Sequence, residues 1–411
     1  MRISRSTALL AAIVPSLLAN PMTAQSTSYP SQVYGTYSQN GQTRDLLLDL
    51  LVPVGSGPWP LLVWVHGGGW QGGNRLPIPA SASRQLARGY AVASIDYRLS
   101  GTATWPAQIH DCKAAIRFLR ANANSYGLDP DRIAVMGSSA GGHLVAALGT
   151  MGGVGATTVG SFAVDLEGTV GSHLGTSSRV QCVVDLYGPT TMLHAHDFPT
   201  FDHDAPTAPE ALLIGGALPL NPEKWASVDP ITFVSADDPP LLALHGTDDT
   251  TVPFHQSVLL LDALQAIGAD AALFAVQDTG HGGAGFGSPA AEAAIDTFLD
   301  GHLRDLPAVT IGIAAVDPSA NENGDPAAFE LSRSGSTQAP LTVRLDLGGD
   351  VTAHRDCAPL PLLATIPAGS ATLIVSLLPF DDGLVEGDET AIARVLPSGD
   401  YRIDQTAAEA T

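Results

Sequence analysis

Up to residue 304, apolar and polar positions alternate in blocks that predict a mixed α/β fold. Short continuous apolar runs such as residues 61–65 are typical of strands buried on both faces of a parallel sheet. The stretches between them have helical spacing of apolar residues. We expect strands over 46–52, 61–65, 91–95, 132–136, 180–186, 241–244 and 271–276, and helices over 80–88, 107–121, 139–149, 255–267 and 289–303.

This alternation predicts a doubly wound, mostly parallel sheet with the site in the loops at its carboxyl edge. After residue 304 the period becomes two: Val309, Ile311 and Ile313 share one face, and the pattern recurs at 341–345 and 373–377. Turn residues between these runs predict a smaller all-β sandwich. We therefore expect an α/β domain over 25–304, a linker over 305–308 and a sandwich over 309–411.

The N-terminus has the pattern of a targeting segment. Arg2 and Arg5 precede an apolar run at residues 8–19 that is too short to span a bilayer. This predicts a signal peptide over residues 1–24, cleaved after Ala24, and a secreted or periplasmic protein without membrane insertion.

Composition narrows the classes of partner. The 411 residues carry 41 acidic and 19 basic side chains, a formal net charge of -22. Nucleic-acid binding is disfavoured, because neutralising phosphates requires lysines and arginines. The three cysteines, Cys112, Cys182 and Cys357, are too few and odd in number for a disulfide framework. Cys112 and Cys182 are expected to be small buried hydrophobes.

A G-x-S-x-G sequence follows the strand expected at 132–136. Residues 137–141 read Gly-Ser-Ser-Ala-Gly and lead into a helical stretch, the pattern of a nucleophile elbow with Ser139 at its centre. A serine hydroxyl is a weak nucleophile at neutral pH. It needs a base, a group that orients the base, and donors for the oxyanion that forms.

Candidates for the donors follow the strand at 61–65. Residues 66–70 read His-Gly-Gly-Gly-Trp, the loop type that forms the other half of an oxyanion hole. We assign the N–H groups of Gly68, Gly69 and Ala140 as the oxyanion donors. His66 is expected to brace the loop.

Acid and base should follow in that order along the chain. Asp248 and Asp249 both lie in the loop after the strand at 241–244; Asp249 is preferred as the orienting acid, and Asp248 stays an alternative. His281 lies in a glycine-flanked loop after the strand at 271–276 and is the expected base.

With these motifs in order, residues 29–304 resemble the α/β-hydrolase family, in its hormone-sensitive-lipase-like and BD-FAE-like branch of bacterial esterases. The resemblance implies hydrolysis of small, short-acyl carboxylic esters through Ser139, Asp249 and His281, with no cofactor for catalysis. Oligomeric state stays open. The matching stretches are residues 66–70, 94–100, 105–111, 127–133, 137–143, 245–253 and 280–283.

Two other functions fit parts of this pattern. One is a serine peptidase or another acyl transferase on the same fold. The other is a secreted, calcium-dependent binding protein with a degenerate hydrolase domain.

An acidic segment lies near the C-terminus, with five acids in residues 381–389. Such clusters are solvated or bridged by a cation, and calcium takes several carboxylate ligands from one loop. The segment resembles a Calx-beta domain, and such a sandwich usually has one more strand than follows Tyr401 here. The resemblance implies calcium ligands at Asp381, Asp382, Glu386 and Glu389, with Glu322 and Asp356 approaching from neighbouring loops.

Residues 190–230 break the alternation and are rich in proline, histidine and aspartate. Histidine and aspartate are both metal ligands, but their spacing here matches no ligand pattern. We expect this stretch to form a loop over the pocket. Its histidines and aspartates include His194, His196, Asp197, Asp202, His203 and Asp204.

Overall fold

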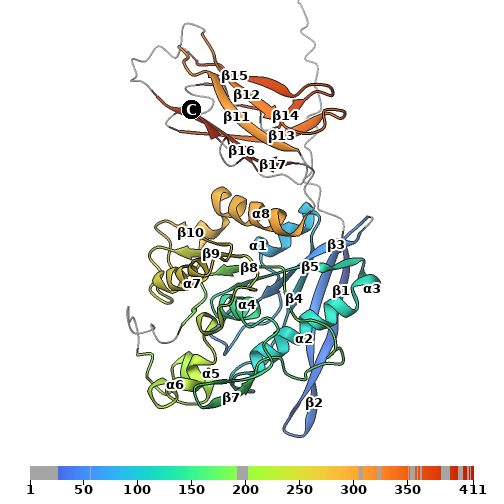
Figure 1. Cartoon of the computed structure of the whole chain (residues 1–411), viewed down its shortest axis with the longest axis vertical. Helices are drawn as coiled ribbons and strands as arrows, with labels where there is room; N and C mark the ends of the chain where they lie inside the picture. The colour runs from blue at the N-terminus through green and yellow to red at the C-terminus, as the bar shows by residue number, and fades with distance from the viewer. Residues whose placement is uncertain are drawn as a thin grey trace, which may run out of the picture.

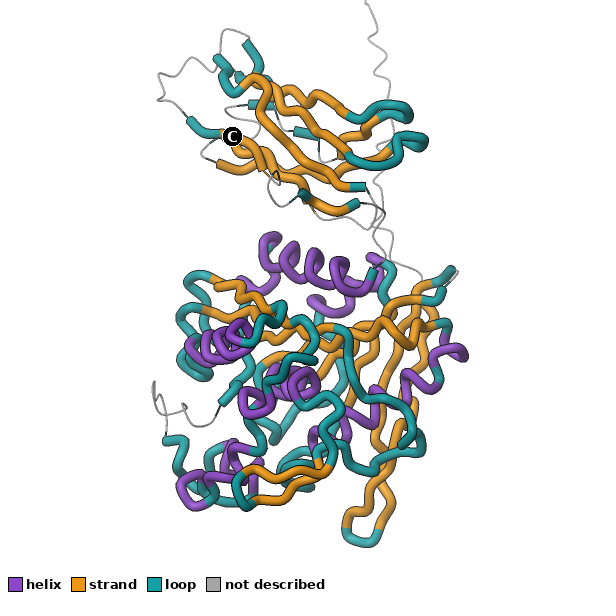
Figure 2. The backbone as a smooth tube through the Cα atoms, viewed as in Figure 1, coloured by secondary structure: helices purple, strands orange, loops and turns teal. Residues whose placement is uncertain are grey.

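A computed structural model shows an α/β domain and an all-β domain (Figures 1 and 2). The predicted signal peptide and linker lie outside the described residues, so both stay predictions. The structure describes residues 26–55, 57–191, 202–304, 309–321, 325–349, 351, 357–358, 360–361, 363–380, 389–396, 401–404, 407 and 409–411.

The α/β domain is built on an eight-stranded sheet in the order β1-β2-β4-β3-β5-β8-β9-β10. The β1–β2 and β2–β4 pairs are antiparallel, and all other neighbours are parallel. The predicted doubly wound, mostly parallel sheet is confirmed. Its strands are β1 (Ser26–Gln39), β2 (Gln42–Pro53), β3 (Trp59–Val65), β4 (Ala91–Ile95), β5 (Leu128–Ser138), β8 (Cys182–Leu186), β9 (Leu241–Gly246) and β10 (Ala271–Val276).

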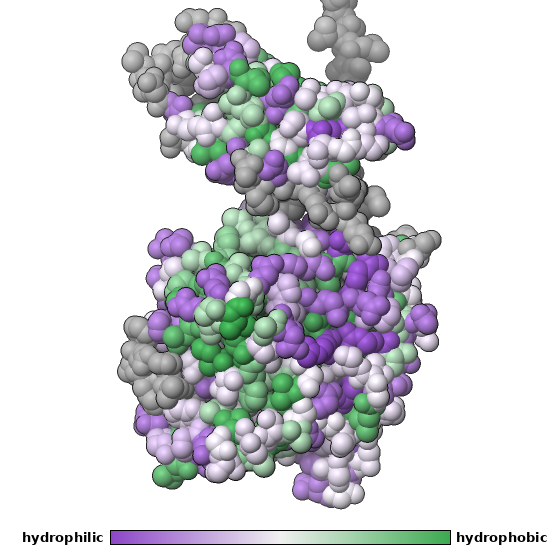
Figure 3. Space-filling model, in the orientation of Figure 1, coloured by the Kyte–Doolittle hydropathy of each residue, from purple (hydrophilic) through white to green (hydrophobic). Residues whose placement is uncertain are grey.

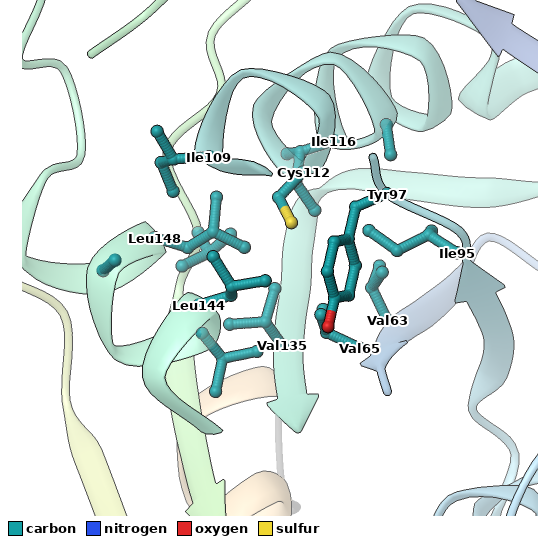
Figure 4. Close-up of a cluster of buried hydrophobic side chains, with 14 of the residues drawn as sticks. Val63, Val65, Ile95, Tyr97, Ile109, Cys112, Ile116, Val135, Leu144 and Leu148 are labelled. Atoms are coloured by element: carbon teal, nitrogen blue, oxygen red, sulfur yellow. The ribbon is translucent and has the colours of Figure 1, made fainter. Parts of the chain in front are cut away.

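Helices cover both faces of this sheet. Figure 4 shows one face, where Ile109, Cys112 and Ile116 of α2 and Leu144 of α4 meet Val135 of β5. Ile109, Cys112 and Ile116 recur at helical spacing, so they lie on one face of α2. On this face lie α2 (Ala107–Ala121), α4 (Ala140–Thr150) and α7 (His255–Ala266), and on the other lie α1 (Ala80–Ser83), the 3-10 helix η1 (Arg84–Arg88) and α8 (Pro289–Leu303).

Shorter elements lie in the connections. They are α3 (Ala123–Tyr126), β6 (Ala156–Val159), β7 (Phe162–Asp165), α5 (Pro209–Ile214), η2 (Leu218–Leu220), α6 (Pro222–Ala226), η3 (Pro230–Phe233) and η4 (Ala284–Gly287).

Strand β1 was not predicted. Its sequence is largely polar, and Tyr34 is one of its few buried side chains. The strand is held by backbone pairing with β2 across a tight turn, in which Asn40 and Gly41 have φ of 52° and 76°. An Asn-Gly turn of this hand matches the twist of a hairpin.

The C-terminal domain is the predicted β-sandwich. Its two four-stranded sheets, β15-β12-β11-β17 and β14-β13-β16-β18, share one apolar core that includes Ile311, Phe329 and Val375 from the first sheet and Val343 and Val395 from the second. The strands are β11 (Thr310–Asp317), β12 (Ala327–Arg333), β13 (Leu341–Gly349), β14 (Leu363–Ile366), β15 (Thr372–Leu377), β16 (Ala391–Leu396), β17 (Arg402–Ile403) and β18 (Glu409–Ala410).

The predicted calcium loop is described only in part. Glu389 is exposed, whereas Asp381, Asp382, Glu386, Glu322 and Asp356 lie outside the described residues. Over the described positions, no group of three or more His, Cys, Asp or Glu side chains could hold a metal ion. The Calx-beta likeness and calcium binding therefore stay predictions. After Tyr401 the chain supplies two short strands, β17 and β18, which pair with β11 and β16.

Other expectations concern the cysteines and the surface. Among the described residues none of the three cysteines forms a disulfide, and all three are buried, as predicted for Cys112 and Cys182. Within the part of the chain that the structure describes, no helix is long and apolar enough to cross a membrane. Figure 3 shows hydrophilic side chains gathered on one part of the α/β domain, over the region of β3 and β5.

A buried ion pair fixes the loop after β4 to helix α2. The Arg98 guanidinium binds the carboxylate of Asp111 with two nitrogens, at 2.8 and 2.6 Å, and Asp111 is fully buried. The same loop braces the glycine-rich loop after β3, because Tyr97 stacks on His66 with ring centroids 4.3 Å apart. The matching stretches 94–100 and 105–111 are thus joined by this pair.

We predict that Arg98→Ala lowers the free energy of unfolding by about 3–5 kcal/mol, because it leaves a buried carboxylate unpaired. Urea unfolding followed by tryptophan fluorescence measures this, since all five tryptophans lie in the α/β domain. Arg44→Ala, which removes an exposed arginine on the β1–β2 hairpin, is the control. Equal stability of the two variants would show that the pair is not needed.

Candidate active site

Ser139 occupies a sharp turn between β5 and α4. Its φ is 55° and ψ is -122°, a conformation that residues other than glycine rarely adopt. Its N–H donates to the Leu186 carbonyl at 2.8 Å, and its carbonyl accepts from His143 N–H at 2.9 Å. The backbone is thereby held in the strained conformation that the G-x-S-x-G motif predicts.

The glycines that flank Ser139 are required by close backbone contacts. A Cβ on Gly141 would lie 2.1 Å from the Val65 carbonyl oxygen, and one on Gly137 would lie 2.3 Å from the Gly141 oxygen. Both distances are too short for any side chain. The elbow therefore packs directly against the carboxyl end of β3, where the glycine-rich loop begins.

A continuous hydrogen-bond chain links the three predicted catalytic residues. Ser139 Oγ lies 2.8 Å from His281 Nε2, and His281 Nδ1 lies 2.7 Å from Asp249 Oδ2. These side chains come from residues 110 and 32 positions apart along the chain, on loops after β5, β9 and β10. The structure thus brings all three together.

The carboxylate of Asp249 is buried but fully hydrogen-bonded. Its Oδ1 accepts the N–H groups of Thr251 and Val252 at 2.8 and 2.9 Å, and its Oδ2 faces His281. Burial alone would raise the pKa of Asp249, but hydrogen bonds from His245, His281 and the Val252 N–H outweigh it and hold that pKa well below its ordinary range. Asp249 is therefore an ionised carboxylate at neutral pH.

Asp248, the alternative acid, is placed differently. Its side chain is exposed, and its N–H donates to the Thr279 carbonyl at 3.0 Å. Of the two adjacent aspartates, the structure brings Asp249 to the histidine.

The glycine-rich loop lies beside the elbow. A Cβ on Gly67 would lie 3.3 Å from Ser139 Cβ. Gly68 and Gly69 have φ of 116° and 59°, and the Gly68 carbonyl accepts two N–H groups, both at 3.0 Å, in a tight turn. Across the described chain, no hydrogen-bond partner is seen for the N–H groups of Gly68, Gly69 or Ala140, the first residue of α4. Ala140 follows Ser139 directly, and Gly68 and Gly69 follow Gly67, the loop residue that contacts Ser139.

The buried His66 supports this loop, as expected. Its Nδ1 lies 2.7 Å from the Gly67 oxygen, and its ring stacks on Tyr97. Burial lowers the pKa of His66, which favours the neutral ring.

Two residues that contact the site were not assigned a role from the sequence. The Tyr187 ring packs edge-on against the His281 ring, with centroids 4.8 Å apart. The His245 ring lies behind Asp249, with Nε2 3.4 Å from Oδ2. His245 stands in a matching motif stretch, but sequence order alone does not say which way its side chain faces. Both contacts arise from packing between neighbouring strand ends.

The stretch at 190–230 reaches the site through helix α5. Pro209, at the start of α5, lies 3.7 Å from the position of a Cβ on Gly69. His203 and Glu210 form a buried pair, with Nδ1 and Oε1 3.2 Å apart. His194, His196 and Asp197 lie outside the described residues. The described part of this stretch therefore borders the glycine-rich loop.

Comparisons with known proteins agree with this architecture. A family model described as BD-FAE matches residues 48–264, more than half of the chain. Esterase LipC of Mycobacterium tuberculosis is 30% identical over 236 residues, which are 55% of this chain and 53% of LipC. The chain spans about half the length of the curated relatives it matches.

Two solved structures are similar over nearly all of their own length. A truncated carbohydrate esterase from gut microbiota is 36% identical, with a TM-score of 0.63, and the match covers 68% of this chain and 97% of that one. The propionate-bound esterase Est2 of Thermogutta terrifontis is 25% identical, with a TM-score of 0.52, covering 66% and 92%.

The matched segment contains Ser139, Asp249 and the glycine-rich loop, and it ends before His281. The structure joins His281 to the other two. The chain belongs to the BD-FAE family and has an α/β-hydrolase fold.

Proposed function

We propose that this protein is a serine esterase that hydrolyses carboxylic esters through an acyl-enzyme on Ser139. The observation that carries the proposal is the hydrogen-bond chain from Ser139 through His281 to Asp249. LipC and the proteins of the two similar structures are all named esterases, which supports ester hydrolysis as the reaction class.

The geometry accounts for activation of the serine. The Ser139 hydroxyl donates to His281 Nε2, which accepts the proton as Oγ attacks the ester carbonyl. The imidazolium that results is stabilised by Asp249, whose low pKa keeps it a carboxylate. Asp249 also holds the hydrogen on Nδ1, so that Nε2 is free to act as the base.

The amide donors act on the other side of the reacting carbon. The N–H groups of Gly68, Gly69 and Ala140 bind the oxyanion of the tetrahedral intermediate. His281 then gives its proton to the leaving alcohol, whose oxygen leaves the acyl carbon. Water, deprotonated by His281, attacks the acyl-enzyme and releases the carboxylic acid and Ser139.

We predict that Ser139→Ala lowers kcat for p-nitrophenyl acetate by about 10⁴- to 10⁶-fold, because the nucleophile is lost. A fluorophosphonate probe should label the native protein at Ser139 and leave this variant unlabelled. Ser138→Ala, which removes the adjacent hydroxyl, should still be labelled. Native-like turnover by Ser139→Ala would reject the assignment.

We predict that Asp249→Asn and Asp248→Asn differ sharply. Asp249→Asn should lower kcat by about 10⁴-fold, because an amide at this position favours the wrong tautomer of the base. Asp248→Asn should stay within about threefold of the native rate, since its carboxylate is solvated. The matched pair is assayed with p-nitrophenyl acetate; a larger loss in Asp248→Asn would assign the acid to that residue.

The substrate class that the relatives favour is a short acyl ester on a carbohydrate. The carbohydrate esterase from gut microbiota matches the α/β domain over nearly its whole length. Est2, whose structure holds propionate, supports a short acyl group. The alcohol part of the ester would then be a sugar hydroxyl.

We predict that the protein releases acetate from acetylated xylose or cello-oligosaccharides. The rate should exceed that on p-nitrophenyl palmitate by at least about 100-fold, because the proposed acyl group is short and each methylene that a site does not accommodate costs roughly 1–3 kcal/mol. Peptide p-nitroanilides are the third arm of the assay. Preferred cleavage of palmitate or of the anilides would indicate a lipase or a peptidase instead.

A further inference from the structure

A second histidine lies close to the Asp249 carboxylate. His245 is the fifth residue of β9, and its side chain is fully buried. Its Nδ1 lies 2.7 Å from Ser257 Oγ on α7, and its Nε2 lies 2.8 Å from the Val252 carbonyl oxygen. The same Nε2 is 3.4 Å from Asp249 Oδ2. The ring, which belongs to β9, therefore links the loop that carries Asp249 to α7.

The partners of His245 determine which nitrogen carries the proton. A carbonyl oxygen only accepts hydrogen bonds, so Nε2 must be the donor toward Val252. In the neutral ring, Nδ1 is then the acceptor, and it takes the Ser257 hydroxyl hydrogen. Ser257 thus fixes the tautomer that points an N–H toward the acid loop.

The Nε2–H of His245 lies near two groups of the turn that spans Asp249 to Val252. It donates to the Val252 carbonyl at 2.8 Å, and the same nitrogen lies 3.4 Å from Asp249 Oδ2, the oxygen that also accepts from His281. Oδ1 is already occupied by two backbone N–H groups. Rotation of the carboxylate away from His281 would therefore break contacts with the backbone and with His245 together.

We propose that His245 is a positioning residue for the acid of the triad. Its Nε2–H holds the Asp249 carboxylate in the orientation that His281 requires. This inference rests on the proposed function, because it assigns the orientation a role in ester hydrolysis. A purely structural histidine, needed only to tie β9 to α7, would act through Nδ1 and Ser257 instead.

Three substitutions separate these roles. His245→Leu removes both nitrogens. His245→Gln places an amide donor near the Nε2 position, toward Asp249, and His245→Asn places polar atoms near the Nδ1 position, toward Ser257. The control is His302→Leu, which removes another histidine beside a carboxylate, since His302 Nε2 lies 3.5 Å from Asp270 Oδ2 at the surface.

We expect His245→Leu to lower kcat for p-nitrophenyl acetate by about 10- to 100-fold, the loss typical when a residue that orients a functional side chain is removed. KM should change less than about threefold, because His245 does not contact the substrate. His245→Gln should recover most of that loss, whereas His245→Asn should not. If His245→Leu does not fold, the Gln and Asn variants still decide, because each keeps a polar group in the buried site. Tryptophan fluorescence checks folding, and His302→Leu should keep the native rate.

A second readout does not depend on turnover. In ¹⁵N-histidine-labelled protein, the low-field proton resonance of His281 Nδ1–H reports its hydrogen bond to Asp249. We expect this resonance to shift or exchange faster in His245→Leu and His245→Asn, and to be restored in His245→Gln. Equal rates and spectra for the Gln and Asn variants would overturn the proposal. Absence of ester hydrolysis by the native protein, with the His281 resonance still dependent on His245, would reject the proposed function alone.

Discussion

The turn at Ser139 depends on backbone packing that leaves no room for side chains. Strand β5 ends and α4 begins within a single residue at positive φ, directly against the end of β3. Only glycine fits at positions 137 and 141, because carbonyl oxygens occupy the space a Cβ would need. This contact places the first amide of α4 next to the glycine-rich loop that follows β3. Ser139, the proposed nucleophile, and the proposed oxyanion donors are therefore positioned by one close approach of two strand ends.

Buried carboxylates near this turn differ in how well they are satisfied. Asp249 receives hydrogen bonds on both oxygens, and its pKa is lowered despite burial. Asp185, at the end of β8, accepts the Gly188 N–H at 2.8 Å, but among the described residues its second oxygen has no partner. Burial raises the pKa of Asp185 to about 6. Hydrogen-bond donors, more than depth, thus decide which carboxyl group stays charged.

Buried polar groups are also paired in the motif stretches that support the glycine-rich loop. Arg98 and Asp111 lie in two separate motif stretches, and their ion pair fixes the loop after β4. Tyr97 of that loop stacks on the His66 ring. The glycine-rich loop is thereby braced by charge pairing, ring stacking and its own turn. Each contact uses polar groups that would be costly to bury alone.

The sequence by itself determined the main strands and helices of the α/β domain from β2 onward, the elbow at Ser139, the glycine-rich loop, and the candidates Asp249 and His281. These features are local: apolar runs, glycines at a fixed spacing, and the order of loops after strands. The sequence could not show β1, because a polar edge strand is held by backbone hydrogen bonds that leave no apolar pattern. Nor could it choose between Asp248 and Asp249 by geometry, or show Tyr187 and His245 against the triad. Those contacts join residues from different strand ends, and only the packing of the sheet decides which side chains meet.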